Sequence, residues 1–199
     1  MYGYKSLDFH ITGVVPLLMH NPRLADPRDE ITKAIKAISK KKSKTEEEYE
    51  EISRLEYLGG LYYSDEHGPV IPGLMLEGAI GAAARLFRKG KDVKTGVVCD
   101  GDWPLLYDGP RDQDELAASA KFALTVAVVV QGKRIFRTRP MFPAGPGGWH
   151  LKFSLLYDPD IVDAGDVANW VEVAGSRCGA GDWHPKYGRW RMGAPEKTR

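Results

Sequence analysis

K-S-L-D-F-H-I-T-G-V-V, residues 5–15, alternates apolar and polar side chains. A period of two predicts a β-strand with one buried face. The strand would place Leu7, Phe9, Ile11 and Gly13 on one side, and Asp8, His10 and Thr12 on the other. Pro16 has no N–H to donate, so we expect the strand to end there.

Working outward from this strand, the chain predicts a regular order of elements. Pro72 begins a helix to about Arg88, and a short strand lies between Val97 and about Tyr107. A strand over Trp149–Tyr157, a helix capped by Asp163 and ended by Gly175, and a last strand over Tyr187–Met192 follow. Strand, helix, strand, strand, helix, strand is the order of an α+β, ferredoxin-like or RRM-like core. Such a core is an antiparallel sheet with two helices on one face.

Two further segments interrupt this order and read as insertions in a single domain spanning residues 1–199. A helical hairpin is expected over about 26–58, with Asp26 as N-cap before Pro27 and Thr45 with Glu48 as a capping box. Its Lys40–Lys44 run fits a solvated helix pair, or alternatively nucleic-acid contact. A long β-hairpin is expected over about 119–141, turning at Gln131-Gly132.

Composition indicates a folded protein without a membrane span. The chain has 199 residues, 43% of them hydrophobic, and a formal charge of +1. No run of about 18 apolar residues is present, and Met1–Leu7 does not resemble a signal peptide, so we expect a cytoplasmic protein. Residues 1–120 carry 16 Lys/Arg against 20 Asp/Glu, and residues 121–199 carry 12 against 7, so the C-terminal part is basic. Cys99 and Cys178 lack zinc-ligand spacing and are expected to be free thiols.

The segment Gly175–Met192 carries the strongest functional signal. It reads G-S-R-C-G-A-G-D-W-H-P-K-Y-G-R-W-R-M, and combines glycines with aromatic and basic side chains. Glycines allow close approach of the backbone, aromatic rings stack on bases, and cations bind phosphates. The alternative is a turn whose aromatics fill the core. That alternative fits Trp190 and Cys178 better than it fits Trp183 and Tyr187.

Three stretches in order resemble the RAMP superfamily, which includes the backbone subunits of CRISPR effector complexes. They are L-D-F-H-I-T-G-V-V-P-L-L-M-H at residues 7–20, G-P-V-I-P-G-L-M-L-E-G-A-I-G-A-A-A-R at 68–85, and G-A-G-D-W-H-P-K-Y-G-R-W at 179–190. Glu77 stands where that family usually has a lysine. The resemblance implies a RAMP-like fold, side-by-side assembly and a divergent relative, such as a phage-encoded one.

These observations favour a non-enzymatic protein that binds single-stranded nucleic acid largely independently of sequence, DNA in preference to RNA, as a homo-oligomer or filament. The sheet and the glycine-rich segment would form the floor, and the β-hairpin a thumb. No cofactor, metal or catalytic residue is expected. The expected contacts are Trp183, His184, Lys186, Tyr187, Arg189 and Arg191 in the glycine-rich segment, and Lys133, Arg134, Arg137 and Arg139 in the β-hairpin.

Two other functions compete with this hypothesis. Some RAMP subunits cut RNA with an aspartate in the loop after the opening strand. The resemblance therefore implies an RNA-guided effector backbone subunit with metal-assisted endoribonuclease activity, for which Asp26 is the first candidate and Asp29 the second. The second alternative is a structural or adaptor protein that uses Trp183 and its neighbours as a protein interface.

Overall fold

A computed structural model describes residues 3–130 and 132–194. The chain forms two compact units. The first contains residues 1–17, 70–108 and 143–199, and the second contains 18–69 and 109–142. Within the described residues, no helix is long and apolar enough to cross a membrane.

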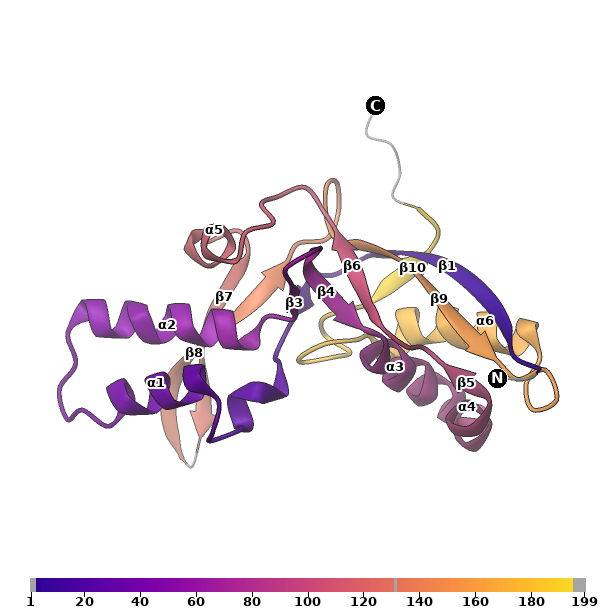
Figure 1. Ribbon diagram of the computed structural model, residues 1–199, viewed down its shortest axis with the longest axis horizontal. Coiled ribbons are helices and arrows are strands. Elements are labelled where there is room, and N and C mark those ends of the chain that lie inside the picture. Colours follow the sequence, from indigo (N-terminus) through magenta and orange to yellow (C-terminus); the bar gives the residue numbers. More distant parts are fainter. Residues whose placement is uncertain (1–2, 131, 195–199) are drawn as a thin grey trace. The chain divides into compact units, whose positions relative to one another are not determined.

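The sheet of the first unit is built around two long antiparallel strands (Figure 1). β1 (Lys5–Gly13) pairs with β9 (His150–Tyr157) from Lys5↔Tyr157 to Thr12↔His150. β10 (Trp190–Met192) pairs with the other edge of β1. β6 (Asp102–Leu106) pairs with β9, and β4 (Gly68–Pro72) pairs with β6, which gives the order β10-β1-β9-β6-β4. The antiparallel ferredoxin-like core predicted from the sequence is confirmed.

Helices cover one face of this sheet (Figure 1). α3 (Gly73–Leu86) packs against α4 (Gly90–Gly96) and α6 (Ala164–Val173). Phe9, Ile11, Leu151 and Leu155 alternate toward the buried side of the strands, where the helices contribute Ile80 and Val167. Burying such side chains stabilises the fold by about 1.5–3 kcal/mol each.

The helical backbone continues past the end of α6. α6 itself ends at Val173, and a π-helical turn, η2 (Ala174–Cys178), follows it and is closed by Gly179 with a φ of +71°. Gly175 was expected to close the helix, but it lies inside this turn. A Cβ at Gly175 would lie 2.4 Å from the indole of Trp190, so this glycine makes room for a side chain of the core. Tyr187–Arg189 also lie outside the last strand, because β10 begins only at Trp190.

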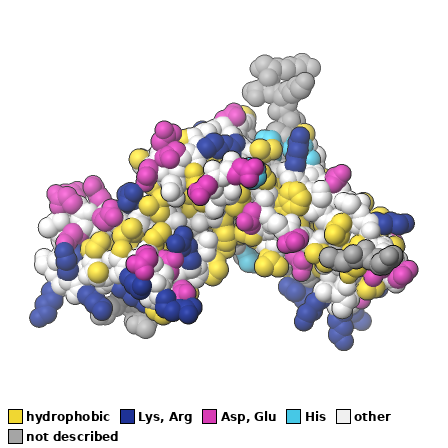
Figure 2. Space-filling model, in the orientation of Figure 1, with side chains coloured by type: hydrophobic (Ala, Val, Ile, Leu, Met, Phe, Trp, Pro, Cys, Tyr) yellow, Lys and Arg dark blue, Asp and Glu magenta, His cyan; other side chains and the backbone are white. Residues whose placement is uncertain are grey.

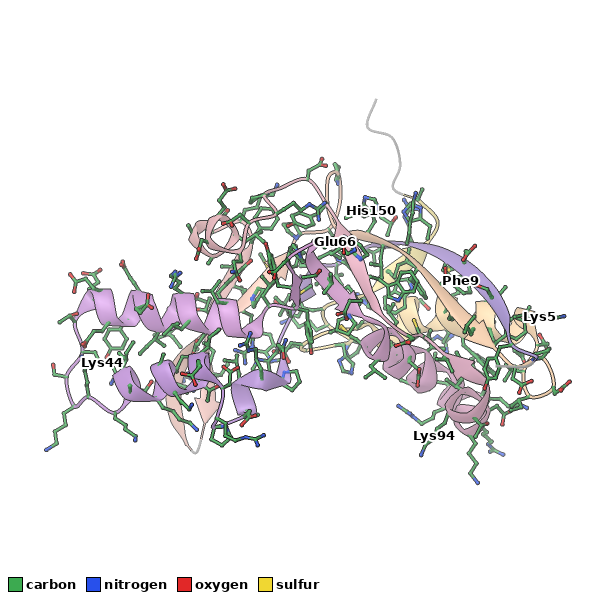
Figure 3. The ribbon with its side chains drawn as sticks, viewed as in Figure 1. Lys5, Phe9, Lys44, Glu66, Lys94 and His150 are labelled. Carbon is green, nitrogen blue, oxygen red and sulfur yellow. The ribbon has the colours of Figure 1, made fainter. Side chains whose placement is uncertain are left out.

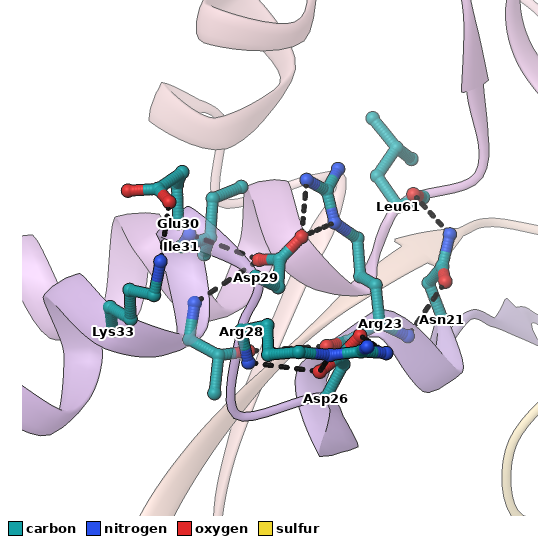
Figure 4. A network of polar contacts seen from close by, with 10 residues as sticks. Asn21, Arg23, Asp26, Arg28, Asp29, Glu30, Ile31, Lys33 and Leu61 are labelled. Atoms are coloured by element: carbon teal, nitrogen blue, oxygen red, sulfur yellow. Dashed lines mark hydrogen bonds and ion pairs between the residues drawn. The ribbon is translucent and has the colours of Figure 1, made fainter.

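The second unit contains the predicted pair of helices, α1 (Glu30–Ser39) and α2 (Glu46–Gly60), preceded by η1 (Pro22–Ala25). The capping box of Thr45 and Glu48 is present at the start of α2. The N-cap of α1 is Asp29 rather than Asp26, because the Asp29 carboxylate accepts the N–H groups of Ile31 and Thr32 (Figure 4). β3 (Tyr63–Ser64) pairs with the first residues of β4.

The predicted β-hairpin is also present in the second unit. β7 (Ala123–Val130) pairs with β8 (Lys133–Phe142), and α5 (Gln113–Ala118) precedes them. β2 (Leu17–Leu18) completes the order β2-β8-β7. Gln131 of the expected turn lies outside the described residues.

Candidate nucleic-acid interface

The glycine-rich loop, residues 179–189, is fixed to the end of β1 by backbone hydrogen bonds. The Gly188 N–H donates to the Pro16 carbonyl oxygen at 2.8 Å, and the Val14 N–H donates to the Arg189 carbonyl oxygen at 2.9 Å. The Ala180 N–H closes the loop by donating to the Gly188 carbonyl oxygen at 3.0 Å. The loop is therefore a held platform rather than a free turn.

Trp183, Lys186 and Tyr187 form a cluster on this loop. The rings of Trp183 and Tyr187 lie 6.1 Å apart, and the Lys186 Nζ lies 5.8 Å from the centre of the Tyr187 ring. Trp183 is 36% exposed, and its φ of +52° lies in the left-handed region. A bulky residue there costs about 1–2 kcal/mol, and strained positions of this kind concentrate at functional sites. The Trp183 ring and the Lys186 ammonium group are exposed, and the Tyr187 ring beside them is half-buried.

His184 lies exposed within the same loop. Its Nδ1 is 2.9 Å from the Gly181 carbonyl oxygen, which fixes the ring against the loop backbone. A Cβ at Gly179 would lie 3.3 Å from the His184 Cβ, so the glycine also gives this side chain room. His184 follows Trp183 directly in the chain, and its hydrogen bond is to the loop backbone rather than to the aromatic cluster.

The last residue of the loop and the two residues after it differ in exposure. Trp190 is buried, and its Nε1–H donates to the Val171 carbonyl oxygen at 3.2 Å, so its side chain belongs to the core as the sequence indicated. Arg191 is exposed on β10. Arg189 is half-buried, and its Nε is buried without a hydrogen-bond partner in the described part of the chain.

The expected hairpin residues belong to the second unit, whereas the glycine-rich loop belongs to the first. Arg134 is exposed. Arg137 forms an ion pair with the buried carboxylate of Glu56, which also accepts the Thr138 N–H at 2.8 Å. Arg139 donates to the Thr138 carbonyl oxygen at 3.3 Å. Lys133 begins β8. Of these four residues, Arg137 has a defined structural role in holding α2 against β8.

Asp26 has a local partner. The Arg28 guanidinium and backbone N–H both donate to its carboxylate (Figure 4). These hydrogen bonds lower the pKa of Asp26, so the side chain is held as a carboxylate. Among the residues the structure describes, no group of three His, Cys, Asp or Glu side chains is placed to hold a metal ion.

A row of polar side chains on the sheet was missed by the sequence analysis as a candidate site. Asp8, His10 and Thr12 on β1 lie directly opposite Ser154, Lys152 and His150 on β9. The His10 Nε2 lies 3.1 Å from the His150 Nδ1 (His150 is labelled in Figure 3). Burial, with a further effect of the nearby Lys152 charge, lowers the pKa of His10 and keeps it neutral at pH 7. The alternation of β1 placed its polar residues on one face, but the partners come from 140 residues away.

Basic side chains also gather at the end of α3 and on α4, where Figure 2 shows a concentration of Lys and Arg. The segment R-L-F-R-K-G-K at 85–91 carries exposed Leu86 and Phe87 among its cations. Lys89 is paired with Asp92 at 2.9 Å, and Lys94 extends from α4 (Figure 3). The density of Lys and Arg in that segment was the available signal, and the sequence analysis did not use it.

No protein-family model matches the sequence, and no curated protein matches it. Among solved structures, the chain is similar to a chain in the cryo-EM structure of the Type III-B Cmr-beta bound to cognate target RNA. The TM-score is 0.54 at 12% sequence identity, and the match covers 98% of this chain and 60% of the neighbour. The chain thus spans about three fifths of that neighbour's length. At this identity the likeness is one of fold alone, and membership of the RAMP superfamily stays a prediction.

Proposed function

We propose that this protein binds single-stranded nucleic acid without cleaving it, through the glycine-rich loop. The observation that carries the proposal is the cluster of Trp183, Lys186 and Tyr187, because an exposed indole and a half-buried phenol ring beside an ammonium group suit stacked bases and a phosphate. The loop is anchored at both ends, so the cluster loses little conformational freedom on binding. The structural neighbour is a chain of the Type III-B Cmr-beta structure, which is bound to cognate target RNA, and this supports a nucleic-acid ligand.

Single strands are preferred over duplex in this proposal because stacking requires an accessible base face. Stacking contributes about 1–3 kcal/mol per base and does not depend strongly on sequence. The proposed strand is DNA rather than RNA, on the ground that Glu77 replaces the lysine usual in the resembling family. The Glu77 carboxylate accepts the Cys99 N–H at 3.2 Å, so this residue has a structural role that a lysine could not fill.

Fluorescence anisotropy tests the proposal with labelled single-stranded DNA, single-stranded RNA and duplex at several salt concentrations. Replacing Trp183→Ala and Lys186→Ala together should weaken single-strand affinity about 10- to 100-fold, and the salt slope should fall by about 0.7. The matched control is Tyr49→Ala with Lys42→Ala, which also removes one exposed ring and one exposed cation. No binding at low salt would refute the proposal. A loss of affinity in the control variant alone would place the contact on α2 and the connection before it.

Assembly along the strand is part of the proposal. Binding of several copies side by side should give cooperative isotherms on long strands and simple isotherms on strands of one site length. Analytical ultracentrifugation of the protein with 10- and 60-nucleotide strands distinguishes the two cases. Non-cooperative binding to the long strand would contradict side-by-side assembly but would not contradict binding of single strands.

A further inference from the structure

Exposed cations gather where α3 meets α4 in the first unit. The segment R-L-F-R-K-G-K-D-V-K at residues 85–94 contains five Lys or Arg and one acid. That acid, Asp92, pairs with Lys89 at 2.9 Å. The other four cations are exposed and have no ion pair within the described part of the chain. We call these four side chains, Arg85, Arg88, Lys91 and Lys94, the α3–α4 corner.

The chain turns at this corner through a hydrogen-bonded helix end. The Arg88 N–H donates to the Arg85 carbonyl oxygen at 3.0 Å, and the Lys89 N–H donates to the Ala84 carbonyl oxygen at 2.9 Å. This is the Schellman pattern, in which the residue after the C-cap has a left-handed backbone and is usually glycine. Arg88 occupies that position with a φ of +61°. The turn itself would form more easily with glycine, so the guanidinium group is what arginine adds there.

Helix electrostatics account for only part of this charge. A cation near the C-terminus of a helix is favourable, which accounts for Arg85 in the last turn of α3. Lys91, however, lies in the first turn of α4, where the helix dipole favours an anion. The structure of the fold therefore leaves most of the corner unexplained, and a group of unpaired cations on one surface suits a polyanion.

The corner is close to the segment that leads into the glycine-rich loop. α3 packs against η2, which ends at Arg177 and Cys178 directly before the loop. Burial raises the pKa of the Cys178 thiol, and the nearby charges of Arg85 and Arg177 lower it, so both guanidinium groups lie near this thiol. The Arg85 guanidinium also lies 3.9 Å from the Cβ position of Gly81, one turn back along α3. Arg177 is exposed and therefore extends the cations of the corner toward the loop.

The side chains of the corner suit the backbone of a nucleic acid better than a lipid surface. Arginine presents a planar fork that binds phosphate through two hydrogen bonds. Phe87 is 45% exposed beside Arg88, and its ring offers a face to a base. A helix that lies in a membrane needs an apolar face, but Val93 of α4 is buried in the fold. Within residues 85–96, all of which the structure describes, Leu86 and Phe87 are the only exposed large apolar side chains.

We propose that the α3–α4 corner binds phosphate groups of the single strand held by the glycine-rich loop, with Arg177 between the two surfaces. This inference rests on the proposed function, since the corner and the loop would hold one strand. Short strands would reach the loop cluster alone, whereas longer strands would also neutralise the corner. The number of phosphates neutralised, and with it the salt dependence of binding, should therefore rise with strand length.

Fluorescence anisotropy with labelled oligothymidylates of 6 and 20 nucleotides tests the proposal at several salt concentrations. The full chain should show a steeper salt slope with the longer strand. The slope is the readout because the number of registers on a long strand changes the affinity but not the slope. Replacing Arg85→Gln and Arg88→Gln together should lower the slope by about 1.4 with the 20-nucleotide strand and leave it unchanged with the 6-nucleotide strand.

The matched control is Lys40→Gln with Lys42→Gln, which removes two exposed cations from the second unit. It should leave both slopes unchanged. An equal fall in the control would show an effect of net charge alone and would overturn the proposal. The Arg85 side chain also packs at Gly90, whose Cβ position lies 2.6 Å from the Arg85 Cγ. If the arginine variant does not fold, Lys91→Gln with Lys94→Gln provides the second test, with the same expected fall.

Arg88→Gly separates a binding role from a structural one. Glycine suits the left-handed backbone, so the midpoint of thermal unfolding should stay the same or rise. The salt slope with the 20-nucleotide strand should nevertheless fall by about 0.7. A lower midpoint with an unchanged slope would give Arg88 a structural role and would overturn the proposal.

Two comparisons distinguish this inference from the proposed function and from lipid binding. A loss in the loop variant, Trp183→Ala with Lys186→Ala, with no change in the arginine variant would overturn the corner and leave the loop function. The reverse result would overturn the loop function and leave the corner. Flotation with vesicles of phosphatidylcholine and phosphatidylserine is the last arm. Vesicle binding that requires Arg85 and Arg88, with strand binding that does not, would overturn the proposal.

Discussion

The Cβ position of Gly188 lies 1.8 Å from the carbonyl oxygen of Ala180, across the closed ends of the glycine-rich loop. No other residue type fits there without moving the backbone. Gly188 also has a φ of +69°, and its N–H is the donor that fixes the loop to Pro16. The loop that carries the aromatic cluster therefore depends on one glycine.

Gly188→Ala should destabilise the protein by about 2–4 kcal/mol, from the left-handed backbone and the overlap together. Gly145→Ala is the matched control, because Gly145 has a φ of +90° and no atom within 4 Å of its Cβ position. The control should lose only about 1–2 kcal/mol. Urea unfolding measures the free energy of unfolding of both variants. Equal losses would show that a small movement of the backbone relieves the overlap with Ala180.

Glu56 is buried in the second unit and ion-paired with Arg137. Glu56→Ala should cost about 3–5 kcal/mol, because it leaves the guanidinium and the Thr138 N–H without their acceptor. Glu51→Ala removes a half-exposed pair with Arg54 at 3.6 Å and should cost at most about 1 kcal/mol. Comparable midpoints of thermal unfolding for the two variants would contradict this difference.

The cysteines should differ in reactivity. Burial raises the pKa of the Cys99 thiol to about 12, so it stays protonated and shielded at pH 8. Burial also raises the pKa of Cys178, but this residue is half-exposed. Iodoacetamide at pH 8 should label Cys178 first in the native protein and both residues in denaturant, as measured by peptide mass spectrometry. Faster labelling of Cys99 in the native protein would show that the segment between β5 (Val97–Val98) and β6 opens.

Stability should fall in mild acid through His10. Its pKa is lowered by burial and by Lys152, and its ring contacts His150. The unfolded chain therefore binds a proton near pH 6.5 while folded His10 remains neutral. The His10 contribution is complete above about pH 6.5, falls as the pH drops below that value, and levels off below the lowered pKa. Urea unfolding at pH 5, 6, 7 and 8 measures this slope.

His10→Gln should reduce the slope between pH 7 and pH 5, while His67→Gln, at the exposed turn between β3 and β4, should leave it unchanged. Identical slopes in wild type and His10→Gln would assign the acid sensitivity to other groups.

Local patterns in the sequence predicted much of the fold. The alternation over Leu7–Gly13 and the capping box at Thr45 act within a few residues, and both predictions are confirmed. The start of a helix is harder to predict where two residues nearby could both cap it. Asp26 and Asp29 are both able to cap α1; in the structure Asp29 is the N-cap, and it also forms an ion pair with Arg23.

The candidate site was also predictable only in part from the sequence. Trp183, Lys186 and Tyr187 lie within five residues, so composition alone could mark them as a candidate cluster, and Trp190 could be assigned to packing. Alternation could not predict that residues 187–189 lie outside the last strand. The end of the loop is set by two backbone hydrogen bonds, from the Val14 N–H to the Arg189 carbonyl oxygen and from the Gly188 N–H to the Pro16 carbonyl oxygen.

By itself, the sequence determined the order of strands and helices, the glycine-rich loop and the basic hairpin, because periodicity and capping are local. Only the tertiary structure decided that His10 meets His150, that Glu56 holds Arg137, and that Glu77 accepts the Cys99 N–H. These contacts join residues 22 to 140 positions apart. Strand register and the path between β5 and β6 set such distances, and neither is encoded in a short window of residues.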